Sequence, residues 1–113
     1  MAQLRIALAQ LNSTVGDLAG NAGLIRRYAG DARQAGAHLL AVPEMALTGY
    51  PVEDLALRGS FVEASRAALA DLAAALAADG LGGLPVVVGY LDHGRAPAEA
   101  GLPRSRSFCT LLN

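Results

Sequence analysis

The order of apolar and polar positions predicts alternating strands and helices along the chain. Apolar residues recur at helical spacing over about residues 22–35 and again over residues 60–79. Four β-type runs flank these helices and are bounded by Gly, Pro, Asn, Asp or Ser: residues 4–9, 37–42, 85–91 and 107–112. Strand, helix and strand at this spacing form a parallel βαβ unit with a right-handed crossover. The sequence therefore predicts an α/β fold in the order βαβαββ, with the run at 85–91 in a central position.

Residues typical of helix ends mark both helices. Asp17 or Asn21 can cap the first helix, and Gly36 stands where a left-handed residue commonly follows a helix. The second helix is expected to begin with the capping box Ser60–Glu63 and to end at residues 79–80. A turn at residues 92–94 is expected to close the third strand.

The run that ends at Val42 leads directly into a carboxylate. A short, wholly apolar run bounded by proline predicts a strand buried on both faces of the sheet. Pro43 keeps Val42 extended, so Glu44 is expected at the carboxyl edge of the sheet, where open α/β sheets bind ligands. A partly desolvated carboxylate there suits a general base. The alternative is an ordinary solvated glutamate at the end of a strand.

The residues after Glu44 predict a turn that folds back over it. Gly49 can adopt a positive φ and Pro51 fixes the exit of the turn. Tyr50, between them, can line a pocket through its hydroxyl group or can serve only in packing. The stretch is interpreted as a site with a lid.

Composition narrows the classes of function. The chain has 113 residues and a net charge of −1, which allow one small domain and exclude a basic surface for nucleic acid. All nine basic side chains are arginine, so lysine is absent. Cys109 is the only cysteine and lies far from His38 and His93, which predicts neither a disulfide nor a metal site. No apolar run reaches the roughly 18 residues of a membrane span, and a cytoplasmic location is expected.

The stretch Pro43–Pro51 resembles the first signature of the nitrilase, or carbon–nitrogen hydrolase, superfamily. Other segments are similar to the glutamine-hydrolysing domain at the N-terminus of bacterial glutamine-dependent NAD synthetases: residues 4–12, 15–18, 21, 51–55 and 86–90. The resemblance runs from residue 4 to about residue 91. It implies the N-terminal portion of an α-β-β-α sandwich, and residues 1–113 are expected to be an incomplete, truncated or frame-shifted part of that domain.

The resemblance also implies a catalytic triad of glutamate, lysine and cysteine in that chain order. Glutamate activates the cysteine thiol, which attacks the amide carbon, and lysine stabilises the oxyanion. Glu44 maps onto the first member and would also activate the water that releases the acyl-enzyme. No lysine is available, and Cys109 lies in an apolar strand, so it is either a displaced nucleophile or a buried, unreactive cysteine.

The implied function is hydrolysis of the glutamine side-chain amide, with the ammonia passing to a separate synthetase domain that makes NAD. No cofactor is expected in this domain, since ATP and magnesium belong to the synthetase domain. This chain alone is expected to be inactive, to form homo-oligomers, and to bind neither nucleic acid nor membrane. Two alternatives stay open: a stand-alone nitrilase-type amidase acting on another small amide, and a non-catalytic interaction module.

Overall fold

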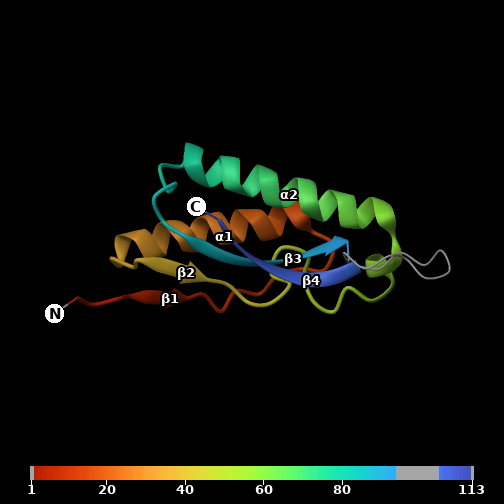
Figure 1. Ribbon diagram of the computed structural model, residues 1–113, viewed down its shortest axis with the longest axis horizontal. Coiled ribbons are helices and arrows are strands. Elements are labelled where there is room, and N and C mark those ends of the chain that lie inside the picture. The colour runs from red at the N-terminus through yellow and green to blue at the C-terminus, as the bar shows by residue number, and fades with distance from the viewer. Residues whose placement is uncertain (1, 94–104, 113) are drawn as a thin grey trace.

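Two helices lie along a four-stranded sheet (Figure 1). The computed structural model describes residues 2–93 and 105–112. The strands follow one another across the sheet in sequence order; the first three are parallel and the fourth is antiparallel to the third. The elements are β1 (Ile6–Leu8), α1 (Leu18–Gln34), β2 (Leu39–Ala41), the 3₁₀ helix η1 (Glu53–Leu57), α2 (Gly59–Ala78), β3 (Val86–His93) and β4 (Ser105–Leu112). The predicted α/β class and the βαβαββ order are confirmed.

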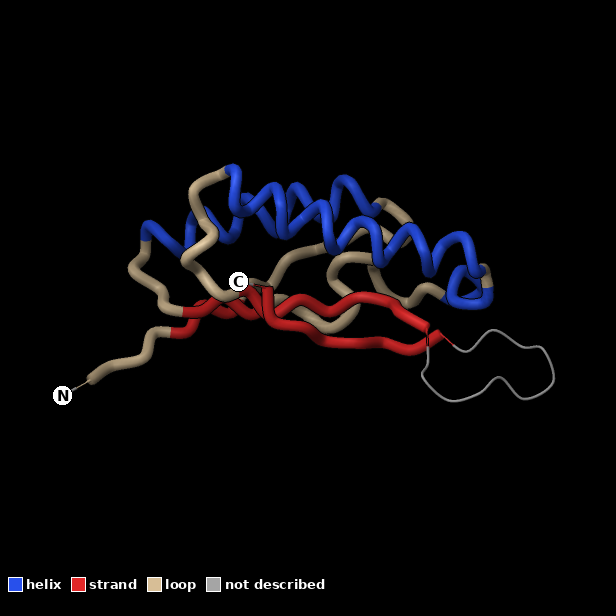
Figure 2. Tube along the Cα trace, turned by 45° about the horizontal axis from the view of Figure 1, so that its top comes forward, coloured by secondary structure: helices blue, strands red, loops and turns tan. Residues whose placement is uncertain are grey.

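Both helices lie on the same side of the sheet (Figure 2). In β2, Leu40 faces the helices and is buried, whereas Leu39 and Ala41 are half-buried. The prediction that this strand is buried on both faces is therefore wrong for the described residues. In this strand, the side chain on the helix side is therefore more completely buried than its two neighbours on the opposite side.

Helix α1 begins one turn earlier than expected because Asp17, rather than Asn21, caps it. The Asp17 carboxylate accepts a hydrogen bond from the Gly20 amide at 3.0 Å. Asn21 lies inside the helix and is buried. The helix ends as predicted, with Gly36 at a φ of +78°.

Helix α2 does not begin with the predicted capping box. Arg58 is the N-cap residue, and its carbonyl accepts hydrogen bonds from the amides of residues 61 and 62. Because η1 ends immediately before Arg58, the chain enters the helix early and Ser60 already lies in the first turn. The Glu63 side chain does not cap the helix but contacts His93. The predicted end of the helix is confirmed, with Asp79 as the C-cap.

Strand β3 lies inside the sheet between β2 and β4, as predicted. The turn expected at 92–94 is wrong for Asp92 and His93, which continue the strand because they pair with residues 106 and 105 of β4. Residue 94 lies outside the described residues. The predicted fourth strand is confirmed and is two residues longer, starting at Ser105.

The core lies between the helices and the sheet. Its buried side chains come from both helices, β2, β3 and the segments after β2 and before β3: Ile25, Ala29, Ala32, Leu40, Ala46, Leu47, Leu72, Leu76, Leu84, Val86 and Val88. In the part of the chain that the structure describes, no helix combines the length and apolar composition needed to cross a membrane.

Candidate functional site

Glu44 opens a turn at the carboxyl end of β2. After Pro43 the chain folds through residues 44–48, and the Gly49 amide donates a hydrogen bond to the Met45 carbonyl at 2.8 Å. Met45 has a φ of +57°, a left-handed conformation that costs a non-glycine residue roughly 1–2 kcal/mol. A turn held in this conformation needs strong support from its surroundings.

Strand β3 and the core provide that support. Three apolar side chains of the turn, those of residues 45–47, are buried. The Leu47 amide donates to the Gly89 carbonyl of β3 at 3.2 Å, and Gly89 lies directly against the backbone of Glu44 and Met45. The apolar side chains thus anchor the turn, while the Glu44 carboxylate points away from the core and is exposed.

The loop after β1 runs beside this turn. The Gly16 amide donates to the Thr48 carbonyl at 2.9 Å. Gly49, at a φ of +80°, packs so closely on Val15 that an added Cβ would lie 2.5 Å from the Val15 Cα. Glycine at position 49 therefore serves both the conformation of the turn and the close approach of the two loops.

A cleft of about 360 Å³ lies between the two loops. Six residues line it: Leu11, Asn12, Ser13, Pro43, Glu44 and Tyr50. The structure thus brings the two predicted site residues, Glu44 and Tyr50, to one cleft at the carboxyl ends of β1 and β2. Ligands of α/β sheets bind at such an edge.

Two polar residues of this cleft were not among the site residues predicted from the sequence. Asn12 and Ser13 follow β1 as Glu44 follows β2, and parallel strands end at the same edge of a sheet. The shared edge of the two parallel strands could therefore have predicted Asn12 and Ser13 as site residues. An amide and a hydroxyl opposite a carboxylate provide hydrogen-bonding groups for a small polar ligand.

The expected partial desolvation of Glu44 is wrong for the described residues. Glu44 is exposed, and Tyr50 is 75% exposed rather than closed over the carboxylate as a lid. The physical reason is that the cleft has walls only where the two loops run, at the rim of the sheet. The Tyr50–Pro51 peptide bond in this wall is cis.

The other predicted chemical groups lie elsewhere. Cys109 pairs in register with Gly89 across β3 and β4, and its side chain lies outside the described part of the structure. His38 is a strand-end residue whose Nδ1 accepts from the Arg5 amide at 2.9 Å. Within residues 2–93 and 105–112, no three His, Cys, Asp or Glu side chains are grouped as a metal site would require.

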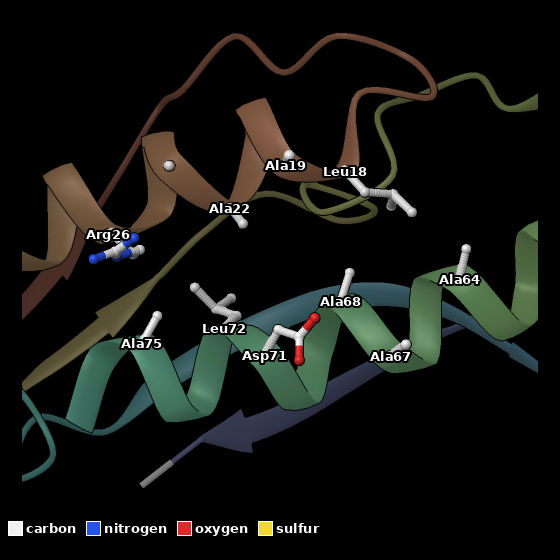
Figure 3. A pocket seen from close by; sticks show the side chains of 11 residues that line it. Leu18, Ala19, Ala22, Arg26, Ala64, Ala67, Ala68, Asp71, Leu72 and Ala75 are labelled. Carbon is white, nitrogen blue, oxygen red and sulfur yellow. The ribbon is translucent and has the colours of Figure 1, made fainter. Parts of the chain in front are cut away.

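A second hollow, of about 440 Å³, runs between α1 and α2 (Figure 3). Alanine side chains dominate it, and Ala22 of α1 and Ala68 of α2 both project into the space between the helices. Its charged residues are Arg26 and Asp71, and the Arg26 guanidinium forms two 2.7 Å hydrogen bonds with Asp79. The groove therefore offers packing surface rather than reactive groups.

A polar network joins α2 to β3 at a third hollow. The His93 Nε2 lies 2.6 Å from the Glu63 Oε1, and the Arg66 Nε lies 3.1 Å from the Asp92 Oδ1. The Tyr90 hydroxyl donates to Asp92 at 3.0 Å. The hydrogen bond with His93, aided by Arg66, lowers the pKa of Glu63 below its ordinary value. His93, expected to lie in a turn, is instead a residue of β3 and part of this network.

Residues 5–93 of the chain are similar in sequence to a known protein family. Residues 5–93 match the sequence model of the family described as carbon–nitrogen hydrolase. A glutamine-dependent NAD(+) synthetase from Rhodobacter capsulatus is 51% identical over 72 residues, which are 64% of this chain and 13% of that protein. The match thus spans about an eighth of the length of that relative.

Solved structures of similar proteins share the fold of this chain. A glutamine-dependent NAD(+) synthetase from Cytophaga hutchinsonii has a TM-score of 0.78 at 25% identity, covering 98% of this chain and 17% of that one. An amidase from Nesterenkonia sp. has a TM-score of 0.60 at 25% identity, covering 94% of this chain and 37% of that one. The observed arrangement of helices and strands therefore recurs in an NAD synthetase and in an amidase.

Proposed function

Because this chain belongs to the carbon–nitrogen hydrolase family, we propose that it forms the Glu44-bearing part of a domain that hydrolyses the glutamine side-chain amide. The observation that carries the proposal is the cleft shared by Glu44 and Tyr50 at the carboxyl ends of two parallel strands. The identity to a glutamine-dependent NAD synthetase supports glutamine as the substrate and NAD synthesis as the use of the ammonia. A synthetase domain is the partner that this use requires.

In this proposal Glu44 is the general base. The buried turn behind Glu44 holds its backbone at the cleft, where the exposed carboxylate would take a proton from a thiol nucleophile. The same carboxylate later activates the water that hydrolyses the acyl-enzyme. Tyr50 contributes a hydroxyl group to substrate binding in the same cleft.

The chain alone is proposed to have no turnover with glutamine. The family chemistry uses a lysine at the oxyanion, and none of the 113 residues is lysine. Loss of one oxyanion donor typically lowers kcat by about 10²- to 10³-fold. The check is ammonia release from glutamine by the purified chain, and turnover that disappears in Cys109→Ala would contradict the proposal.

A chimera tests the role of Glu44 directly. Residues 5–93 replace the matching segment of the Rhodobacter capsulatus synthetase, and glutamine hydrolysis is measured with and without Glu44→Gln. The nearly isosteric amide cannot accept the proton, so kcat is expected to fall by at least about 10²-fold with the fold unchanged. Glu53→Gln, the same change at an exposed residue of η1, is the matched control. Full turnover by the Glu44→Gln chimera would rule out Glu44 as the base.

Tyr50→Phe in the same chimera tests the binding role. Loss of one hydroxyl contact is expected to raise KM for glutamine several-fold while kcat changes little. An unchanged KM would leave Tyr50 with a packing role only.

The similarity to the Nesterenkonia amidase favours a second candidate, an amidase acting on another small amide. The two candidates differ in substrate selection. Parallel assays of the chimera with glutamine, acetamide and propionamide distinguish them, since a glutaminase site requires the α-amino and α-carboxylate groups of its substrate. Faster turnover of the simple amides would support the second candidate.

A further inference from the structure

We propose that Asn21 is a positioning residue that sets the separation of the two walls of the Glu44 cleft. This inference rests on the proposed function and adds a residue that does not itself line the cleft. Asn21 lies on α1, behind the two loops that form the walls.

The Asn21 side chain is only 1% exposed and is hydrogen-bonded on both of its polar atoms. Its Nδ2 donates to the Thr14 carbonyl at 2.8 Å and to the Leu47 carbonyl at 2.9 Å. Its Oδ1 accepts from the Thr14 amide at 2.8 Å. Both amide hydrogens and the oxygen are therefore used in bonds to backbone groups.

These bonds join the two walls through one side chain. Thr14 directly follows Ser13 of the first wall, and Leu47 lies three residues after Glu44 in the second. Helix α1, which carries Asn21, serves as the rigid support for both loops. A change at position 21 is therefore expected to alter the distance between Ser13 and Glu44.

The chemistry of this position requires a carboxamide. Aspartate has nearly the same shape, but its carboxylate can only accept, so the oxygen that replaces Nδ2 could not bond to the carbonyls of Thr14 and Leu47. Alanine removes all three bonds, including the buried bond to the Leu47 carbonyl. Asn21→Asp thus tests the two donated bonds, and Asn21→Ala tests the whole clamp.

Displacement of Glu44 is expected to affect turnover more than binding. A misplacement of about 1 Å can lower the rate of a reaction by about 100-fold. Asn21 does not touch the cleft, so its loss removes no direct contact with substrate. The expected signature is a fall in kcat with KM almost unchanged.

The chimera that carries residues 5–93 provides the test, with glutamine as the probe. Asn21→Asp and Asn21→Ala are expected to lower kcat by about 10- to 100-fold and to change KM by less than about threefold. Assays are run well below the unfolding midpoint of each variant. The matched control is Ile25→Val, a buried change one turn further along α1, which is expected to retain kcat even where it lowers the midpoint.

Each other outcome contradicts the inference in a recognisable way. If Glu44→Gln abolishes turnover but both Asn21 variants keep kcat, the clamp is wrong and the proposed function stands. If Ile25→Val loses kcat as severely as Asn21→Asp, the loss of activity comes from general damage to the core and not from the loss of the Asn21 hydrogen bonds, and the inference is wrong. If the parent chimera is inactive or indifferent to Glu44→Gln, the proposed function fails, and the inference fails with it.

Discussion

Gly89 of β3 lies directly against the peptide that joins Glu44 to Met45. A Cβ added at position 89 would collide with the Met45 backbone nitrogen and would lie 3.1 Å from the Glu44 Cα. Both obstacles are backbone atoms, which cannot rotate away as a side chain can. Glycine at this position therefore allows the Glu44 turn to rest on the sheet.

Gly89→Ala is expected to push the Glu44 turn off β3. The overpacking should lower the free energy of unfolding by about 1–3 kcal/mol. Urea denaturation of the chain measures the loss. Gly30→Ala is the matched control, because no other group lies within 4 Å of that added Cβ in α1 and alanine should stabilise the helix by about 0.5–1 kcal/mol. Equal effects of the two substitutions would contradict the close contact at Gly89.

The Arg26–Asp79 pair predicts a specific dependence of stability on pH. Hydrogen bonding to Arg26 lowers the pKa of Asp79, so the unfolded chain takes up this proton at a higher pH than the folded chain. The pair's contribution is present above the ordinary aspartate pKa of about 3.9 and is lost as the pH falls through the folded value. Asp79→Asn should therefore reduce the difference between unfolding midpoints measured at pH 6 and pH 3. The control is Asp71→Asn on the same helix, since no ion pair found among the described residues includes Asp71.

In the polar network between α2 and β3, the pKa of Glu63 is expected to depend on His93. His93 is the main cause of the lowered pKa of Glu63, so His93→Ala should raise that pKa toward its ordinary value. Titration of the Glu63 carboxyl carbon by NMR measures the change. His38→Ala, which removes a histidine bonded to the Arg5 amide instead, should leave the Glu63 titration unchanged. A Glu63 pKa unaffected by His93→Ala would show that the 2.6 Å contact does not persist in solution.

The sequence predicts the parts of this molecule that depend on local pattern. The periodicity of apolar residues specifies the strands and helices, and the proline after Val42 places Glu44 at the end of β2. The exposure of Glu44 was not predictable in the same way, because it depends on which elements cover the sheet. Local pattern alone does not contain that information.

Asn21 and Glu63 show the same limit of prediction from local sequence pattern. Asn21 looks like a helix cap in sequence, yet its partner Leu47 is 26 residues away and is brought close only by the fold. Glu63 looks like half of a capping box, but it contacts His93, which is 30 residues away. In both cases a tertiary hydrogen bond replaces the local one that the sequence pattern predicts.

The exposed apolar side chains of β1, at one edge of the sheet, lead us to expect that the chain self-associates. Ile6 and Leu8 of β1 are 51% and 75% exposed, and among the described strands β1 pairs only with β2, which leaves one edge open. Exposed apolar side chains on an open edge strand promote pairing between molecules, and a charge there opposes it.

Sedimentation velocity of the chain at increasing concentration is expected to show dimers or larger species, and Leu8→Glu should shift the distribution toward monomer. Leu57→Glu, the same change at an exposed leucine of η1, is the control and should have a smaller effect. A folded monomer at all concentrations, with or without Leu8→Glu, would show that this apolar edge does not drive association.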